Sequence, residues 1–161
     1  MEIKIWTDGS FNRKNNKCSW AYVIKIYDHN FYHEDCGEIF DTDEKVSTNV
    51  GEMYAVIKAL EICIEAFPDK EIRKDVDIHV TSDSQYVVKG ITYWIHDWLY
   101  SNFSKRKNHL LWKTLYKLVY KSNWNIVDFS WVRGHTGIEE NERCDYLAGK
   151  ITTTRPHLFK D

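Results

Sequence analysis

Glycine, proline and long apolar runs are all scarce in this chain. Only seven glycines and two prolines occur in 161 residues, which argues against collagen-like and low-complexity sequences, because both depend on these residues. No apolar run approaches the roughly 18 residues that a membrane-spanning helix needs, and the start, MEIKIWTDGS, lacks the charged and apolar regions of a leader peptide. We therefore expect a compact cytoplasmic or otherwise intracellular protein with no membrane partner.

Paired cysteines and an excess of positive charge are also missing. The four cysteines lie far apart without a Cys-x-x-Cys pair, which argues against a zinc site and against a disulfide framework. We expect reduced, mostly buried thiols at Cys18, Cys36, Cys63 and Cys144. The net charge of -2 provides no long-range attraction for phosphate, so any nucleic-acid binding must depend on local basic patches.

Apolar and aromatic side chains are plentiful. Hydrophobic residues make up 43% of the chain and aromatic residues 15%, enough for a substantial core in a chain of this length. No internal repeat, low-complexity tract or linker divides the sequence. We expect one domain over residues 1–161, with a flexible tail at about 155–161, that acts as a monomer without an obligate protein partner.

Hydrophobic periodicity predicts a mixed sheet with helices packed on both faces. Alternation at 2–7, 18–27 and 31–39 indicates an antiparallel meander whose first strand ends at the turn signal Asp8-Gly9. Apolar residues from Met53 to Phe67 recur with helical spacing, and Pro68 closes that helix. Strands at 76–81 and 125–132 then alternate with helices around 84–100, at 108–121 and from about 139. Three antiparallel strands followed by two parallel ones give an α/β architecture.

Four acidic residues converge in this topology. Asp8 and Asp83 follow strands that point the same way, Glu52 lies in the first turn of a helix that starts at that edge, and Asp145 lies in the last helix. If the first and fourth strands pair, this edge lies where the strand order switches, which is the place where open α/β sheets usually bind ligands. Crowded carboxylates repel unless a cation neutralises them, and Mg²⁺ favours a few carboxylates with water and phosphate. Two such ions about 4 Å apart can activate water and stabilise a leaving oxygen.

Each acid also has an ordinary structural explanation. Asp83 is a suitable N-cap for the helix that follows it, and Asp8 suits a turn. Glu52 can complete a capping box with Asn49 as N-cap, and Asp145 can be a solvated helix flank. Each of these explanations is reasonable for one acid alone. They explain the set of four less well, because four carboxylates in one crevice would destabilise the metal-free fold.

Four segments carry a family resemblance. They are WTDGS (6–10), GEMYAVIKALE (51–61), TSDSQYVVKGITYWIHDW (81–98) and WVRGHTGIEENERCDYLA (131–148). In this order they resemble the type 1 ribonuclease H family through nearly the whole chain, although one segment alone would be a weak signal. The resemblance implies a ribonuclease H-like five-stranded mixed sheet. It also implies an endonuclease that cuts the RNA strand of RNA/DNA hybrids and leaves 5′-phosphate and 3′-hydroxyl ends.

The resemblance assigns roles to individual residues. It makes Asp8, Glu52, Asp83 and Asp145 the metal-binding carboxylates, with Asp8 bridging two Mg²⁺ ions, for which Mn²⁺ is a candidate substitute. His135 would assist proton transfer or product release. Glu142 is expected to be a surface acid of the last helix.

Substrate contacts are implied at two places. Asn49 and the turn Gly9-Ser10 match family positions that recognise the 2′-hydroxyl of RNA. Three residues correspond to a small pocket that grips a DNA phosphate: Ser47, Thr48 and Asn108. The loop FNRKNNKC (11–18) departs from the family pattern, so Asn12, Asn15 and Asn16 receive no role.

Basic and aromatic side chains of the middle segment have two interpretations each. The basic cluster is Lys105, Arg106 and Lys107, and Lys113, Lys117 and Lys121 follow at i+4 spacing. They form either a phosphate-contacting face, with a steep salt dependence of binding, or a solvated helix surface. Four tryptophans are expected to pack in the core and not to stack on bases: Trp94, Trp98, Trp112 and Trp131.

Two rival functions remain on the same fold. One is a DNA-cutting resolvase or transposase-like nuclease, which the RGHTG and NERCD segments disfavour. The other is a binding module without chemistry, which has no need of four converging carboxylates. The sequence therefore predicts a Mg²⁺-dependent hybrid ribonuclease.

Overall fold

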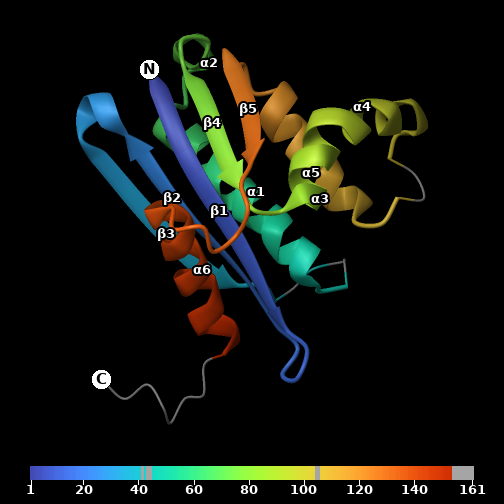
Figure 1. Ribbon diagram of the computed structural model, residues 1–161. Helices are drawn as coiled ribbons and strands as arrows, with labels where there is room; N and C mark the ends of the chain where they lie inside the picture. The colour runs from blue at the N-terminus through green and yellow to red at the C-terminus, as the bar shows by residue number, and fades with distance from the viewer. Residues whose placement is uncertain (41, 43–44, 104–105, 154–161) are drawn as a thin grey trace.

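Five strands form a single mixed sheet in the order β3-β2-β1-β4-β5 (Figure 1). The computed structural model describes residues 1–40, 42, 45–103 and 106–153, so the expected tail at 155–161 lies outside the described residues. The strands are β1 (Glu2–Asn12), β2 (Lys17–Ile26), β3 (Phe31–Glu38), β4 (Asp77–Ser82) and β5 (Ile126–Trp131). β1 to β3 are antiparallel, and β4 and β5 pair in parallel with β1 and β4. The predicted meander and the pairing of the first and fourth strands are confirmed.

β1 is longer than the sequence predicts. The prediction that this strand ends at residue 7 is wrong, because β1 stays paired with β2 from Asp8↔Ala21 to Asn12↔Lys17. The chain reverses at 13–16, where Asn16 takes a left-handed φ of 55°, a conformation that asparagine tolerates better than most residues. Asp8 therefore lies inside a strand, just past the last residue of β1 that pairs with β4.

Helices cover both faces of the sheet, as predicted. The longer ones are α1 (Thr48–Ala66), α5 (His109–Tyr120) and α6 (Glu139–Thr152). The shorter ones are η1 (Tyr27–His29), α2 (Lys70–Arg73), α3 (Gln85–Lys89), the π-helical turn η2 (Gly90–Trp94), α4 (Ile95–Trp98) and η3 (Leu99–Ser101). α1 packs on β1 and β2 with α3 and α5 beside it, whereas α6 packs on β1 to β3 and leaves β4 and β5 open on its side (Figure 1). No helix among the described residues is long and apolar enough to cross a membrane.

Strand alternation divides the side chains between two cores. Ile78 and Val80 of β4 join the main core under α1, together with most of the apolar residues of β1 and β2. Trp6 joins the smaller core under α6, with Cys144 and Leu147 from the helix. The same alternation turns the odd-numbered residues of β4 toward the α6 side of the sheet.

The four tryptophans do not behave alike. Trp112 is fully buried and Trp98 partly buried, as expected for core residues. The same prediction is wrong for Trp94 and Trp131, which are 39% and 42% exposed. Trp94 ends η2, with its ring beside those of Tyr86 and Trp98. Trp131 ends the edge strand, where its indole N–H donates to the Asp83 carbonyl over 3.0 Å.

All four cysteines are free thiols. Cys18, Cys63 and Cys144 are buried, and Cys36 is partly exposed. The expectation of reduced, mostly buried cysteines is confirmed.

Candidate active site

Two glycines let the start of α1 pack directly against β1. A Cβ on Gly9 would lie 2.2 Å from the backbone nitrogen of Glu52, and a Cβ on Gly51 would lie 2.6 Å from the carbonyl oxygen of Ser19. No side chain fits between the helix and the strand at this point. The close approach brings the Glu52 carboxylate beside Asp8.

Three carboxylates meet at this contact. Oxygens of Asp8, Glu52 and Asp83 lie within 4.8 Å of one another, the first two buried and the third partly exposed. The backbone N–H of Gly9 donates to Asp8 Oδ1 over 2.9 Å. Glu52 Oε2 is buried without a hydrogen-bond partner among the described residues. A buried oxygen of this kind is costly unless something binds it, and a divalent cation satisfies this donor set.

The ordinary explanations for Glu52 and Asp83 are wrong. The N-cap of α1 is Ser47, whose hydroxyl accepts from the backbone N–H of Val50, so Asn49 and Glu52 do not form the expected capping box. The N-cap of α3 is Ser84 and not Asp83. Caps that use serine leave the Glu52 and Asp83 carboxylates available for another role.

Burial dominates the electrostatics of the cluster. It raises the pKa of Asp8 to about 7, and the negative charges of Asp83 and Asp145 add to the rise while hydrogen bonds from Glu52 and Gly9 oppose it. Burial also raises the pKa of Glu52 well above its ordinary value, with Asp8 as the next cause. The pKa of Asp83 is raised by burial and then by Asp145. In the metal-free protein these carboxyl groups therefore stay protonated to a higher pH than an exposed carboxyl group does.

Asp145 of α6 is not one of the three acids that meet, although its charge acts on Asp8 and Asp83. It is half exposed, and oxygen or nitrogen atoms of His135, Glu142 and Asp145 form a second group within 4.8 Å. His135 Nδ1 lies 4.0 Å from Asp145 Oδ2, and its backbone has a left-handed φ of 58°. The sequence analysis treated Glu142 as a surface acid. It is partly buried and accepts from the backbone N–H of Gly137 over 3.4 Å.

Hydrogen bonds along α6 fix its position on the sheet. The Cys144 thiol donates to the Trp6 carbonyl, and the Ser19 hydroxyl donates to the Ala148 carbonyl over 2.7 Å. At the end of α6 the Thr152 carbonyl accepts from two side-chain amides, and the Thr152 hydroxyl pairs with Ser10 over 2.8 Å. The amides belong to Asn12 and Asn15 of the loop that matched no family pattern. That loop therefore anchors the helix that carries Asp145.

One contact of Asp83 was missed by the sequence analysis. A Cβ on Gly134 would lie 3.0 Å from Asp83 Oδ2, so the segment that follows β5 passes directly over the carboxylate. The only sequence signal for this contact was a glycine in the RGHTG stretch, because a loop has no periodicity to interpret.

The expected substrate residues fall in two places. Thr48 is exposed on the first turn of α1, with Ser47 and Asn49 partly exposed beside it. Asn108 is 2% exposed with a left-handed φ of 62°, and its amide donates to the Tyr86 hydroxyl over 3.2 Å. Of the basic cluster, Lys105 lies outside the described residues. The Arg106 guanidinium lies 5.4 Å from the Trp98 ring centroid.

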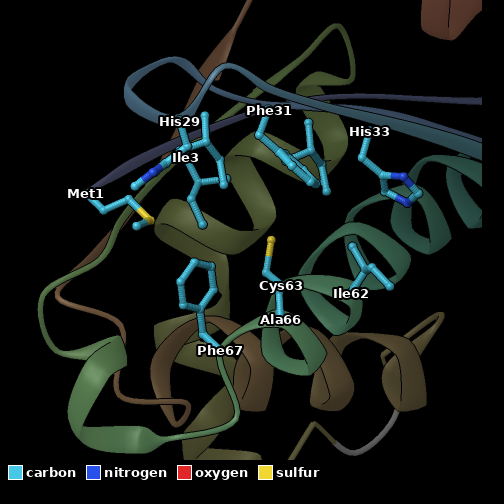
Figure 2. A pocket seen from close by; sticks show the side chains of 11 residues that line it. Met1, Ile3, His29, Phe31, His33, Ile62, Cys63, Ala66 and Phe67 are labelled. Atoms are coloured by element: carbon cyan, nitrogen blue, oxygen red, sulfur yellow. The ribbon is translucent and has the colours of Figure 1, made fainter.

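An apolar pocket of about 300 Å³ lies elsewhere, at the end of the sheet where β1 begins (Figure 2). It is lined by Ile3, Ile24 and Phe31 of the sheet, by Cys63 and Ala66 of α1, and by Phe67 directly after α1. It contains no carboxylate and shares no residue with the acid cluster.

Sequence comparison identifies relatives over almost the whole chain. The RNase H family model matches residues 1–152. Ribonuclease H of Shewanella denitrificans is 34% identical over 160 residues, which cover 96% of this chain and 89% of the relative. Ribonuclease H of a Sulfurovum species is 38% identical over 147 residues, with 91% and 88% coverage.

A solved structure resembles the fold as well. The crystal structure of LC11-RNase H1 in complex with an RNA/DNA hybrid matches with a TM-score of 0.64 and 25% sequence identity. The match covers 93% of this chain and 96% of that chain.

Proposed function

This chain belongs to the RNase H family, and we propose that it hydrolyses the RNA strand of RNA/DNA hybrids, leaving 5′-phosphate and 3′-hydroxyl ends. One observation carries the proposal. Three carboxylates from β1, α1 and the end of β4 converge in a buried cluster with an unsatisfied oxygen on Glu52. The crystallised relative LC11-RNase H1 with its bound hybrid supports the choice of substrate.

We assign the metal-binding role to Asp8, Glu52, Asp83 and Asp145. Bound Mg²⁺, or Mn²⁺ in its place, would supply an activated water and neutralise the charge of the leaving oxygen. Asp8 is central, because it is the acid on which the charges of both Asp83 and Asp145 act. Glu52 contributes its unpartnered oxygen from the α1 side, and Asp145 closes the site from α6.

His135 is assigned a role in moving a proton at the edge of the site. Its ring is largely exposed and lies 4.0 Å from the Asp145 carboxylate, so it can exchange protons with solvent and with a departing product. The left-handed backbone at His135 and the glycine before it hold the ring beside the cluster.

Substrate contacts are proposed on either side of the acids. On one side, Thr48 and Asn49 at the start of α1 present a hydroxyl and an amide next to Glu52, suited to a phosphate and a 2′-hydroxyl. Ser47 caps the same helix end, and Gly9 and Ser10 lie beneath it on β1. On the other side, Asn108 fixes the start of α5. Arg106 and Lys107 lie nearby and can contact the nucleic-acid backbone.

The proposed setting is a monomer in a reducing intracellular compartment. Four free cysteines fit that environment. The rival DNA-cutting nuclease of the same fold is less well supported, because the curated relatives that match the chain are ribonucleases H.

A cleavage assay tests the proposal. The protein is incubated with labelled RNA/DNA hybrid, single-stranded RNA and duplex DNA, each with Mg²⁺ or with a chelator. We expect cleavage of the RNA strand of the hybrid only, and only with the metal. Cleavage of duplex DNA would support the resolvase-like alternative, and hybrid binding without cleavage would support the binding module. Because basic side chains that contact phosphates release counterions, hybrid binding should also weaken steeply with salt.

A further inference from the structure

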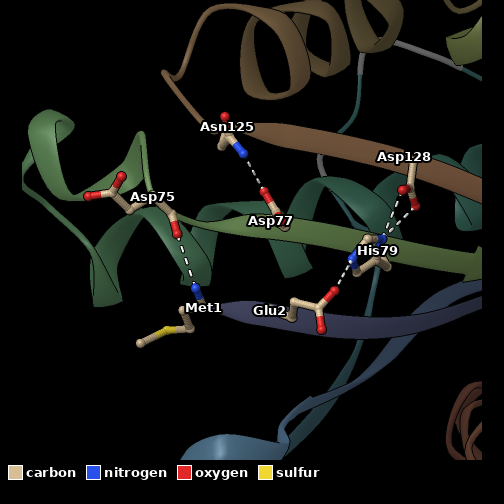
Figure 3. A network of polar contacts seen from close by, with 7 residues as sticks. All are labelled: Met1, Glu2, Asp75, Asp77, His79, Asn125 and Asp128. Carbon is tan, nitrogen blue, oxygen red and sulfur yellow. Dashed lines mark hydrogen bonds and ion pairs between the residues drawn. The ribbon is translucent and has the colours of Figure 1, made fainter.

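On the open half of the sheet, one histidine side chain lies between two acids (Figure 3). His79 Nδ1 lies 2.8 Å from Asp128 Oδ2 on β5, and its Nε2 lies 3.1 Å from Glu2 Oε1 on β1. An ionised carboxylate only accepts hydrogen bonds, so both ring nitrogens must donate, and only the imidazolium form can do this. The geometry therefore assigns a positive charge to the ring.

The other charged groups around the ring are engaged elsewhere. Lys4 of β1 stands opposite His79 in the strand register, with its Nζ 5.3 Å from the ring centroid of Tyr27. Asp77, on the same side of β4, accepts from the Asn125 amide over 2.7 Å. The two acids in contact with the ring are thus the groups that set its charge. The hydrogen bond to Asp128 raises the pKa of His79, partial burial opposes the rise, and Glu2 adds to it.

β5 is an edge strand, so side-chain contacts with β4 add to its single backbone ladder and to the bond from the Trp131 indole to the Asp83 carbonyl. Its neighbour in the sheet is β4. Two side-chain bridges join the two strands: Asn125 to Asp77 near the start of β5, and His79 to Asp128 farther along. The first bridge uses a neutral amide, whereas the second needs a charged ring. β5 then leads into the segment 132–138, which passes over Asp83 and carries His135.

We propose that His79 is a positioning residue, an imidazolium clamp that holds β5 on β4 and thereby keeps the Gly134–His135 segment beside the acid cluster. The ring ties three strands together while it is charged. When it loses its proton, at most one of the two acids can still receive a hydrogen bond from it. Because the folded-state pKa of His79 lies above the ordinary 6.5, the charged ring contributes its full stabilisation of the fold below pH 6.5. Its contribution is lost as the pH rises through the folded-state pKa.

Hydrogen exchange of the backbone amides tests the clamp directly. Protection of the β5 amides and of Gly134 is measured in the whole protein at about pH 6, below the ordinary pKa of the imidazole, and at about pH 9, well above it. We expect protection to fall between the two conditions, after correction for intrinsic exchange. The variant His79→Gln should have low protection at both and little pH dependence. If His79→Gln lost the same amount of protection relative to the unaltered protein at both pH values, the contact would be merely structural and the proposal would be overturned.

A matched control uses the other bridge. Asn125→Ser removes the neutral bridge between the same strands, so it should lower β5 protection while the pH dependence remains. Titration of the His79 ring by NMR gives a second readout. We expect a midpoint above 6.5 that falls in Asp128→Asn and falls less in Glu2→Gln. A ring that titrates at or below its ordinary value would also overturn the clamp.

The consequence for catalysis rests on the proposed function and is read as a ratio. Hybrid cleavage by His79→Gln, divided by that of the unaltered protein, should rise toward one with increasing pH, because the unaltered protein loses its clamp. The effect should fall on kcat and not on KM, since the segment carries His135 and not the main substrate contacts. Absence of cleavage in both proteins would count against the proposed function alone, because hydrogen exchange reports the clamp independently.

Discussion

The molecule holds two acid clusters that handle their charge in opposite ways. The cluster of Asp8, Glu52 and Asp83 is largely buried, contains no basic side chain, and has raised pKa values caused first by burial. In the other cluster, Glu2 and Asp128 are more than half exposed and share the charged ring of His79. The open cluster is partly neutralised within the chain, one positive ring against two acids. The buried one is left incomplete, which is what a metal-dependent site requires.

The largest effect should come from removing one acid of the buried cluster. Asp83→Asn should lower Mg²⁺-dependent hybrid cleavage by at least about a hundredfold, a loss typical of a preorganised electrostatic contact. It should also raise the melting temperature of the metal-free protein, since one repelling charge disappears. Activity assays and calorimetry check the two halves.

Ser84→Ala is the matched control for this change. Because Ser84 is the N-cap of α3, its loss should cost about 1 kcal/mol of stability and leave cleavage nearly intact. A lower melting temperature in Asp83→Asn would contradict the repulsion argument.

The packing that creates the buried cluster gives the second prediction. Gly9→Ala places a Cβ 2.2 Å from the Glu52 backbone, so α1 must move and the free energy of unfolding should fall by about 1–3 kcal/mol or more. Gly149→Ala, in α6 with nothing within 4 Å of the new Cβ, should instead stabilise by about 0.5–1 kcal/mol. Denaturant unfolding of both variants measures the contrast. Similar behaviour of the two would remove the close contact from the explanation.

The pH dependence should sharpen the comparison. Asp8 has an ordinary pKa of 3.8 that rises to about 7 in the fold, so between these values the folded protein binds more protons than the unfolded chain. The cluster's contribution to the stability of the metal-free protein should therefore decline as the pH rises through this window. Mg²⁺ should raise the melting temperature more near pH 7 than near pH 5, because binding displaces protons. A metal effect independent of pH would contradict the raised pKa values.

The smallest effect should come from the open cluster, with the opposite sign. Glu2→Gln removes an acid that is 64% exposed in its side chain, so it should lower stability by less than about 1 kcal/mol. The decrease should be visible below pH 6.5, where His79 is charged, and fade above its folded-state pKa. Thermal scans across this range measure it. A stabilised Glu2→Gln would mean that the two clusters do not differ as described.

Periodicity and chain direction were enough to predict most of this fold. The meander, the parallel return of β4 and β5 and the apolar stripe of α6 all follow from local patterns. The end of β1 was missed because Asp8-Gly9 has the composition of a turn, whereas the pairing with β2 continues through it. Pairing between strands is a tertiary property that a local signal cannot report.

The acids themselves could be found from topology, but the details around them could not. Serine takes both N-caps in place of Asn49 and Asp83, and composition does not distinguish among such good capping residues. Nor could the sequence show that Trp94 and Trp131 are exposed, because aromatic residues serve cores and surfaces alike. The partnership of His79 with Glu2 and Asp128 depends on strand register, which became visible only with the sheet assembled.

The anchoring of α6 has a mechanical consequence. Hydrogen bonds hold this helix at three positions along its length. The Trp6 carbonyl accepts one of them, and the Ser19 hydroxyl and the hairpin asparagines donate the others. A shift of α6 along its axis by one residue would displace Asp145 by about 1.5 Å and would break the hydrogen bonds at all three positions. The hydrogen bonds at Thr152, about two helical turns from Asp145, therefore help to set how far the Asp145 carboxylate reaches toward Asp8.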